Sequence, residues 1–176
     1  MTAEEAETFH SAQIEAFRES AADMIGAFTM TYPEEAIGIA RAAARNGLPA
    51  AIAFTVETNG RLPSGDTVQA AVEQVDAASN GNAPAYYMIN CAHPSHFEQA
   101  LPVGAPWVHR VRGLRANAST MSHAELDEAT ELDAGDPEDL ARRYRALRDR
   151  IPQLSVLGGC CGTDHRHIAA ICDACL

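Results

Sequence analysis

The sequence lacks the features that mark several large protein classes. No stretch approaches the roughly 20 consecutive apolar residues of a membrane-spanning helix. The N-terminus, Met1-Thr-Ala-Glu-Glu-Ala-Glu, is acidic where a secretory signal peptide is basic. Positive charge is scarce: 13 Lys+Arg against 24 Asp+Glu give a formal net charge of −11, so nucleic-acid phosphates and anionic lipids would repel the chain. These absences predict a cytoplasmic protein that binds neither nucleic acid nor membranes.

The chain is also short for some folds. Its 176 residues, of which 47% are apolar and 21% charged, have the composition of a globular protein. Residues 1–176 are therefore expected to form a single domain, since no low-complexity linker or charge block divides them. A complete (β/α)8 barrel usually takes about 250 residues, more than this chain contains.

Strand-like and helical segments alternate along the chain. Apolar runs predict strands at residues 23–28, 50–56, 85–91, 107–114 and 154–157. Helical periodicity and capping residues predict helices at residues 3–21, 33–47, 68–75, 94–101, 136–147 and 164–175, with an Asn80-Gly-Asn turn between the third helix and its following strand. Apolar strands that are each followed by a helix are typical of parallel β/α units. Residues 116–135 form a long irregular stretch, which is either a functional loop or a plain surface excursion.

The cysteines are absent from the first ninety residues and are concentrated afterwards, at Cys91, Cys160, Cys161, Cys172 and Cys175. Such clustering in a chain without an export signal indicates metal binding or thiol chemistry rather than a disulfide framework. Two predicted strands end in Asn90-Cys91 and in Gly158-Gly-Cys-Cys-Gly-Thr163. The carboxyl ends of parallel strands meet at one edge of a sheet, so three thiols can meet there. Three sulfur ligands with one open position are typical of a catalytic zinc.

Other interpretations of these residues are open at this stage. A cysteine at a strand end is often only a small apolar core residue. Cys172 and Cys175 could join Cys160 and Cys161 in a four-thiolate zinc or iron–sulfur site, although their positions far along a helix make that reach poor. Four histidines near the thiols can add metal ligands, but their positions favour polar surface, loop or helix-start roles; they are His93, His96, His165 and His167. Thr163 is the expected N-cap of the last helix.

The cysteine motifs resemble a known signature. Val156-Leu-Gly-Gly-Cys-Cys-Gly-Thr163, followed by His167-Ile168 and preceded by Ile89-Asn-Cys91, resembles the zinc-binding signature of the homocysteine S-methyltransferase family. Further segments match in the same order: Ala53-Phe-Thr-Val56, Gly60-Arg-Leu with Gly65, and Arg115-Ala-Asn-Ala118 in place of that family's Pro-Asn-Ala-Gly.

The resemblance implies a TIM-type (β/α)8-barrel enzyme of α/β class, in which Cys91, Cys160 and Cys161 hold Zn2+ and the homocysteine sulfur takes the open position. Attack of that thiolate on a sulfonium or quaternary ammonium donor would give methionine, a step of methionine biosynthesis. S-methylmethionine or S-adenosylmethionine is favoured over a folate as donor. Asn117 and Asn90 are carried over as substrate-site residues.

The chain departs from the family pattern in two ways. Only about the last five of the eight strands are present, which leaves strand edges exposed. The chain is therefore expected to be either a fragment of a longer enzyme or an obligate oligomer, in which a second copy or a partner chain completes the barrel. Phe28-Thr29 stands where the family typically has Glu-Thr to hold the homocysteine amino group, and a phenylalanine cannot accept hydrogen bonds from an ammonium group. The alternative function is a non-catalytic zinc-binding module or an inactive fragment that keeps the three-cysteine site.

Overall fold

The computed structural model describes residues 1–79 and 81–176 of the chain. Asn80, the first residue of the predicted Asn80-Gly-Asn turn, lies outside the described residues. The strands are β1 (Ile25–Met30), β2 (Ala50–Phe54), β3 (Tyr86–Asn90), β4 (Val111–Ala116) and β5 (Val156–Gly159). The helices are α1 (Ala3–Arg18), α2 (Pro33–Arg45), α3 (Val68–Ala78), α4 (Pro94–Phe97), α5 (His123–Glu128), α6 (Pro137–Arg150) and α7 (His165–Cys175), with a 3-10 helix η1 (Pro106–Arg110).

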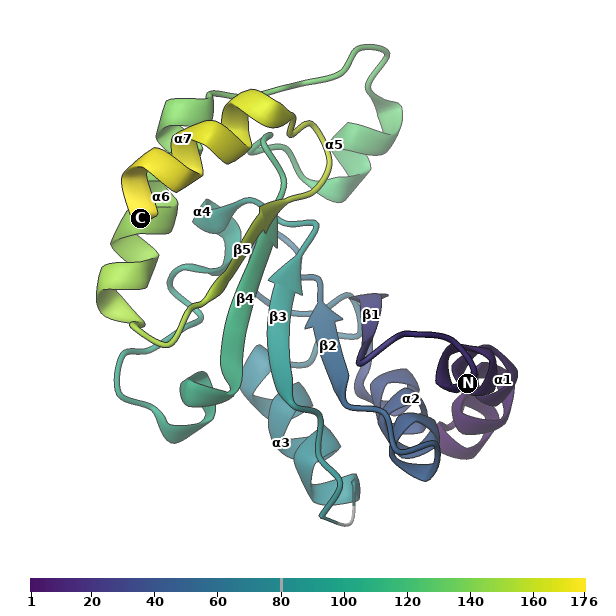
Figure 1. Cartoon of the computed structure of the whole chain (residues 1–176). Coiled ribbons are helices and arrows are strands. Elements are labelled where there is room, and N and C mark those ends of the chain that lie inside the picture. Colours follow the sequence, from purple (N-terminus) through teal and green to yellow (C-terminus); the bar gives the residue numbers. More distant parts are fainter. Residues whose placement is uncertain (80) are drawn as a thin grey trace.

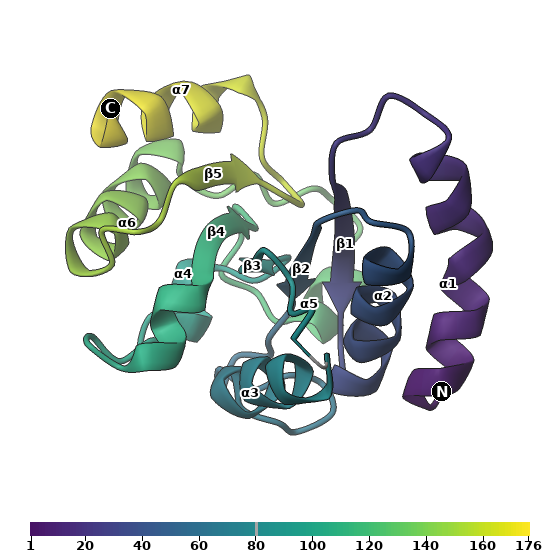
Figure 2. The same cartoon turned by 60° about the horizontal axis from the view of Figure 1, so that its bottom comes forward.

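The strands form one parallel sheet in the order β1-β2-β3-β4-β5, which confirms the predicted class of parallel β/α units (Figure 1). Figure 2 shows that the strands follow an arc, with α2, α3, α6 and α7 along its outer side. The first helix, α1, packs outside α2, beyond the free edge of β1. The molecule is therefore a curved, open sheet with helices on its convex side and free edges at β1 and β5.

The two faces of the sheet have different side chains. Ile52, Phe54, Tyr87, Ile89 and Leu114 are fully buried against apolar residues of the helices. Successive side chains of a strand point to opposite faces, so the intervening residues face the concave side.

The middle of the concave face is built from small side chains and one flexible one. Ala51, Ala53 and Met88 are buried there, outside the main apolar cluster. Gly113 leaves room for the Met88 side chain, because a Cβ at Gly113 would lie 2.6 Å from the Met88 Cγ. Met88 therefore fills the space over Gly113 on the concave face.

The helices begin where the sequence supplies caps. Thr2 and Glu5 form a capping box at α1, Pro33 occupies the first turn of α2 with Glu34 and Glu35, and Asp136 caps α6. The predicted cap at Thr163 was wrong. Asp164 caps α7 instead, with its carboxylate accepting from the backbone N–H of Arg166 at 2.9 Å.

Four other predicted segments differ from the structure. The predicted strand at 107–114 begins as the 3-10 helix η1, because Pro106 favours a helical start and Trp107 and Val108 are buried from that turn; β4 follows from Val111. The irregular stretch at 116–135 contains α5, which a capping box of Ser122 and Glu125 starts. The first and last strands each lie two residues later than predicted. Within the described residues, no helix is both long and apolar enough to cross a bilayer.

Candidate metal centre

Three cysteine sulfurs gather at the carboxyl ends of β3 and β5. The Cys91 Sγ lies 2.7 Å from the Cys160 Sγ and 3.8 Å from the Cys161 Sγ, and all three sulfurs lie within 4.8 Å of one another. Cys91 and Cys160 are half-buried, and Cys161 is exposed. The predicted meeting of thiols from two strand ends is present, with one side of the cluster open to solvent.

Backbone hydrogen bonds of the sheet bring the cysteine segments together. The Cys91 N–H donates to the Arg115 carbonyl at 3.0 Å, and the Cys160 N–H donates to the Ala116 carbonyl at 2.8 Å, so β4 holds both cysteine segments. Cys91 turns the chain away from β3 in the left-handed region, with φ 53°. Gly159 is required by close packing, since a Cβ there would collide with the Thr163 side chain. The turn that carries Cys160 and Cys161 is therefore too tight for a larger residue at position 159.

Asn117 connects the two cysteine segments. Its Nδ2 donates to the Cys91 carbonyl at 3.0 Å, and its Oδ1 accepts from the Cys161 N–H at 3.1 Å. The side chain is buried, so both bonds are protected from water. Asn117 follows β4 directly and occupies the space between Cys91 and Cys161.

His123 is a neighbour of the site that the sequence did not reveal. Its Nε2 lies 2.6 Å from the Cys91 carbonyl, and its Nδ1 lies 3.3 Å from a Glu57 carboxylate oxygen. Burial opposes protonation, but the contacts with the Cys91 carbonyl and Glu57 outweigh it and raise the pKa of His123. The capping box at Ser122 was the available signal that a helix, and not an irregular loop, brings this histidine to the site.

Asn90 ends β3 beside Cys91. Its Nδ2 donates to the Thr29 hydroxyl at 2.5 Å, and its Oδ1 is buried without a hydrogen-bond partner among the described residues. The side chain is 2% exposed. Asn90 thus lies next to the thiols with one unused acceptor.

The four histidines flagged in the sequence do not join the sulfurs. Among residues 1–79 and 81–176, the grouping of side chains that can hold a metal contains Cys91, Cys160 and Cys161 alone. His93 caps α4 and is buried, which lowers its pKa to about 4, while His96 contacts the Thr120 carbonyl. His165 is exposed as expected.

His167 corrects the expectation of a surface residue. It is fully buried, because its Nε2 donates to the Ala134 carbonyl at 2.8 Å while its Nδ1 accepts from the Asp164 N–H at 3.1 Å. Cys172 is exposed and Cys175 is buried in α7, away from the three-sulfur group. The four-thiolate alternative is therefore wrong for the described residues.

Burial hinders ionisation of the Cys91 thiol. Burial, followed by the hydrogen bond and charge of Cys160 and the proximity of Cys161, raises the pKa of Cys91 to about 12. Clustered thiols of this kind ionise readily only when a cation binds among them. Three sulfurs within 4.8 Å of one another are an arrangement suited to a metal ion.

Comparison with known proteins identifies the family. The family model for homocysteine S-methyltransferase matches residues 1–175. The chain belongs to the homocysteine S-methyltransferase family. A comparison with curated protein sequences gives no match.

Two solved structures share the fold of this family member. The apo form of the homocysteine methyltransferase MmuM from Escherichia coli matches with a TM-score of 0.68 and 19% identity, over 99% of this chain and 58% of that one. The metallated form matches with a TM-score of 0.67 and 19% identity, over 97% and 51%. The chain therefore spans little more than half the length of these proteins, in agreement with a partial barrel.

Proposed function

We propose that this chain carries the metal-binding half of a zinc-dependent homocysteine S-methyltransferase, which moves a methyl group from a sulfonium or related donor to homocysteine and yields methionine. The observation that carries the proposal is the three-sulfur cluster at the strand ends of a chain that belongs to this family. A cytoplasmic location and a role in methionine biosynthesis stay predictions.

The donor set fits zinc. Three thiolates are soft ligands that suit Zn2+, and three protein ligands with a remaining open position are typical of catalytic zinc sites. Cys91, Cys160 and Cys161 would hold the ion, and the exposed side of the cluster, at Cys161, leaves access for a fourth ligand. When bound, zinc supplies a Lewis acid that lowers the pKa of a substrate thiol.

The reaction needs little from other side chains. A lone pair of the homocysteine sulfur forms the new S–CH3 bond, while the bond from the methyl carbon to the donor sulfur or nitrogen breaks and its electron pair stays on the donor. No proton moves at the methyl carbon, so no general base is required there. Asn117 would position Cys91 and Cys161 through the hydrogen bonds described above, in addition to its predicted place near substrate.

The open sheet requires a cover. Phe28 is 42% exposed on β1, and Val156 is 37% exposed on β5, so apolar side chains are uncovered at both free edges. Further strands pairing with these edges would bury them and close the barrel. We expect another polypeptide segment, from a longer form of this chain, from a second copy or from a partner chain, to supply them.

The alternative function is a zinc-binding module without catalysis. The observation that favours it is Phe28, which offers no acceptor to a substrate amino group. Such a module would bind zinc through the same three cysteines and transfer no methyl group.

Zinc content and methyl transfer test these functions in sequence. Protein purified under reducing conditions should bind about one zinc per chain, Cys160→Ala should lose it, and the matched control Cys172→Ala should retain it. The zinc-loaded chain is then assayed with homocysteine and S-methylmethionine, S-adenosylmethionine or betaine. Turnover supports the enzyme, and bound zinc without turnover would contradict the claim that this chain suffices for methyl transfer. Absence of zinc from the unsubstituted chain contradicts both.

A further inference from the structure

Arg115 is a cation at the thiol site without an acidic partner. It is half-buried at the end of β4, and its Nε donates to the carbonyl of Gly159, the residue before Cys160, at 3.3 Å. Within residues 1–79 and 81–176, no carboxylate oxygen lies within 4.0 Å of its guanidinium nitrogens. By contrast, Arg110 pairs with Asp76 at 2.9 Å. An unpaired guanidinium in a chain with a net charge of −11 is available for an anionic ligand.

Phe28 fixes the direction of this guanidinium. The Arg115 Cζ lies 4.9 Å from the centroid of the Phe28 ring, across the concave face of the sheet. Stacking of this kind holds a guanidinium plane while leaving its edge free to donate hydrogen bonds. The residue that departs from the family pattern therefore supports a cation, where a carboxylate in its place would attract an ammonium group.

Asn90 offers the complementary group. It is the register partner of Arg115 in the β3–β4 ladder, and its buried Oδ1 has no hydrogen-bond partner among the described residues. Buried polar atoms are nearly always satisfied, so an unused acceptor at a site points to a ligand donor.

Both groups lie within reach of a ligand on the thiols. Asn90 precedes Cys91, and Gly159, which Arg115 contacts, precedes Cys160. Consecutive Cα atoms are about 3.8 Å apart. In homocysteine, three bonds of about 1.5–1.8 Å separate the sulfur from the α-carbon, so its carboxylate and ammonium groups lie within about 6 Å of the sulfur. A thiol ligand at the cluster can therefore extend to Arg115 and Asn90.

We propose that Arg115 binds the carboxylate of the acceptor thiol and that the Asn90 Oδ1 accepts a hydrogen bond from its α-ammonium group. This inference rests on the proposed function, and it assigns to Arg115 and Asn90 the recognition of the amino-acid end of that substrate. Recognition of the amino acid then comes from β3 and β4 of this chain, and Phe28 orients the arginine.

The test is calorimetric binding to the zinc-loaded full chain of three thiols: homocysteine, 4-mercaptobutanoate, which lacks the ammonium, and 3-aminopropane-1-thiol, which lacks the carboxylate. Arg115→Gln should weaken the first two about tenfold or more and leave the third within about twofold. Asn90→Ala should weaken homocysteine and the aminothiol and spare 4-mercaptobutanoate.

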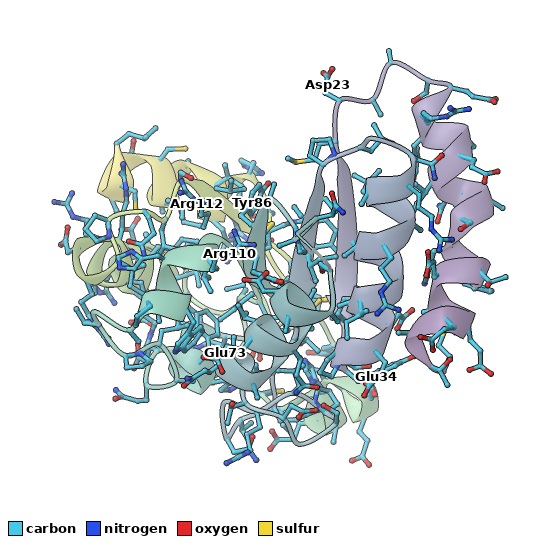
Figure 3. All side chains as sticks on the ribbon, turned by 90° about the horizontal axis from the view of Figure 1, so that it is seen from below. Asp23, Glu34, Glu73, Tyr86, Arg110 and Arg112 are labelled. Atoms are coloured by element: carbon cyan, nitrogen blue, oxygen red, sulfur yellow. The ribbon has the colours of Figure 1, made fainter. Side chains whose placement is uncertain are left out.

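The matched control is Arg112→Gln, which removes the same charge from the same strand. Arg112 is exposed and lies near Tyr86 on the side from which Figure 3 views the molecule, where the strands begin, and its substitution should leave all three affinities unchanged. Zinc content and circular dichroism verify that each variant folds. If Arg115→Gln fails to fold, Arg115→Lys is the second variant, because it keeps the charge but loses the flat stacking group. It should weaken the binding of homocysteine and of 4-mercaptobutanoate several-fold.

The outcomes separate this inference from the proposed function. Equal homocysteine affinity for Arg115→Gln and the unsubstituted chain would overturn the inference, as would an equal loss for all three thiols. Binding of zinc but of no thiol by the unsubstituted chain would overturn the proposed function and the inference with it.

Discussion

Cys161 donates its backbone N–H to the side-chain oxygen of Asn117 at 3.1 Å, although 44 residues separate the two along the chain. The same amide group donates to the Cys91 carbonyl from its nitrogen. One buried side chain therefore connects the two loops that carry the thiols, and the proposed metal site depends on a residue that would contribute no ligand atom.

Replacing Asn117 with alanine should weaken zinc binding about tenfold to a hundredfold, the usual effect of removing a group that orients metal ligands. Both loops lose a buried hydrogen bond, so the sulfurs are held less firmly. Competition with a chromogenic chelator measures the affinity. Asn46→Ala is the control, because that side chain also bonds a backbone carbonyl, but at the end of α2. Equal zinc affinity in Asn117→Ala and Asn46→Ala would contradict the positioning role.

Removing the Tyr144 hydroxyl should destabilise the fold. The hydroxyl donates to the Gly158 carbonyl at 2.7 Å and accepts from the Ala116 N–H at 2.8 Å, where the side chain is fully buried. Tyr144→Phe leaves both backbone groups unsatisfied and should lower the free energy of unfolding by about 1–3 kcal/mol, measured by urea denaturation. Tyr86→Phe, at a half-buried tyrosine without a hydroxyl hydrogen bond to the described residues, should change it by much less.

Zinc should alter the reactivity of one exposed cysteine and not another. Cys161 and Cys172 are both exposed, but only Cys161 belongs to the three-sulfur group. An alkylating reagent should modify both residues in the metal-free protein, and zinc should protect Cys161 alone. Peptide mass spectrometry gives the two rates. A Cys161 rate that zinc leaves unchanged would argue against its role as a ligand.

Asp164 should make the stability depend on pH in the acid range. Hydrogen bonds from the Arg166 guanidinium above all, and from the Arg166 backbone N–H, hold the pKa of Asp164 well below its ordinary value against the opposing effect of burial. The ionised form is thus favoured in the folded protein. Its stabilisation is complete above the unfolded-state pKa of about 3.9 and is lost as the pH falls toward the lower folded-state value.

Asp164→Asn isolates this charge, because asparagine also caps helices well. The variant should be less stable than the unsubstituted chain at pH 7, and the difference should shrink below about pH 4 in urea denaturation. Arg166→Gln removes the main partner and should show the same trend. A difference that stays constant from pH 7 to the acid range would refute the charge effect.

The sequence was sufficient to predict the parallel β/α class and the meeting of Cys91, Cys160 and Cys161, because strand ends in such sheets converge whatever the details of packing. Prediction from local sequence was wrong where an apolar run is compatible with either a strand or a buried turn. Trp107 and Val108 are apolar and buried, as strand residues would be, but they lie in a 3-10 turn. The two-residue offset of β5 has a similar source, since Leu154 is buried just before the strand begins.

The long-range polar contacts could not be predicted from the sequence. His123 reaches the Cys91 carbonyl from 32 positions away, and His167 is buried through a bond to Ala134 from 33 positions away. In both contacts the acceptor is a backbone carbonyl. Every residue has one, so no sequence motif marks these two acceptors. Asn117 was expected near the substrate, and that place stays a prediction, whereas its contacts with both cysteine loops emerged only from the fold.

The left-handed backbone conformation of Cys91 lowers the stability of the fold, while the residue supplies one of the three sulfurs. A residue with a Cβ is disfavoured at φ 53° by roughly 1–2 kcal/mol, and glycine or asparagine would fit there more comfortably. Neither supplies a sulfur. The thiol at position 91 is therefore held at a cost in stability that glycine would not carry.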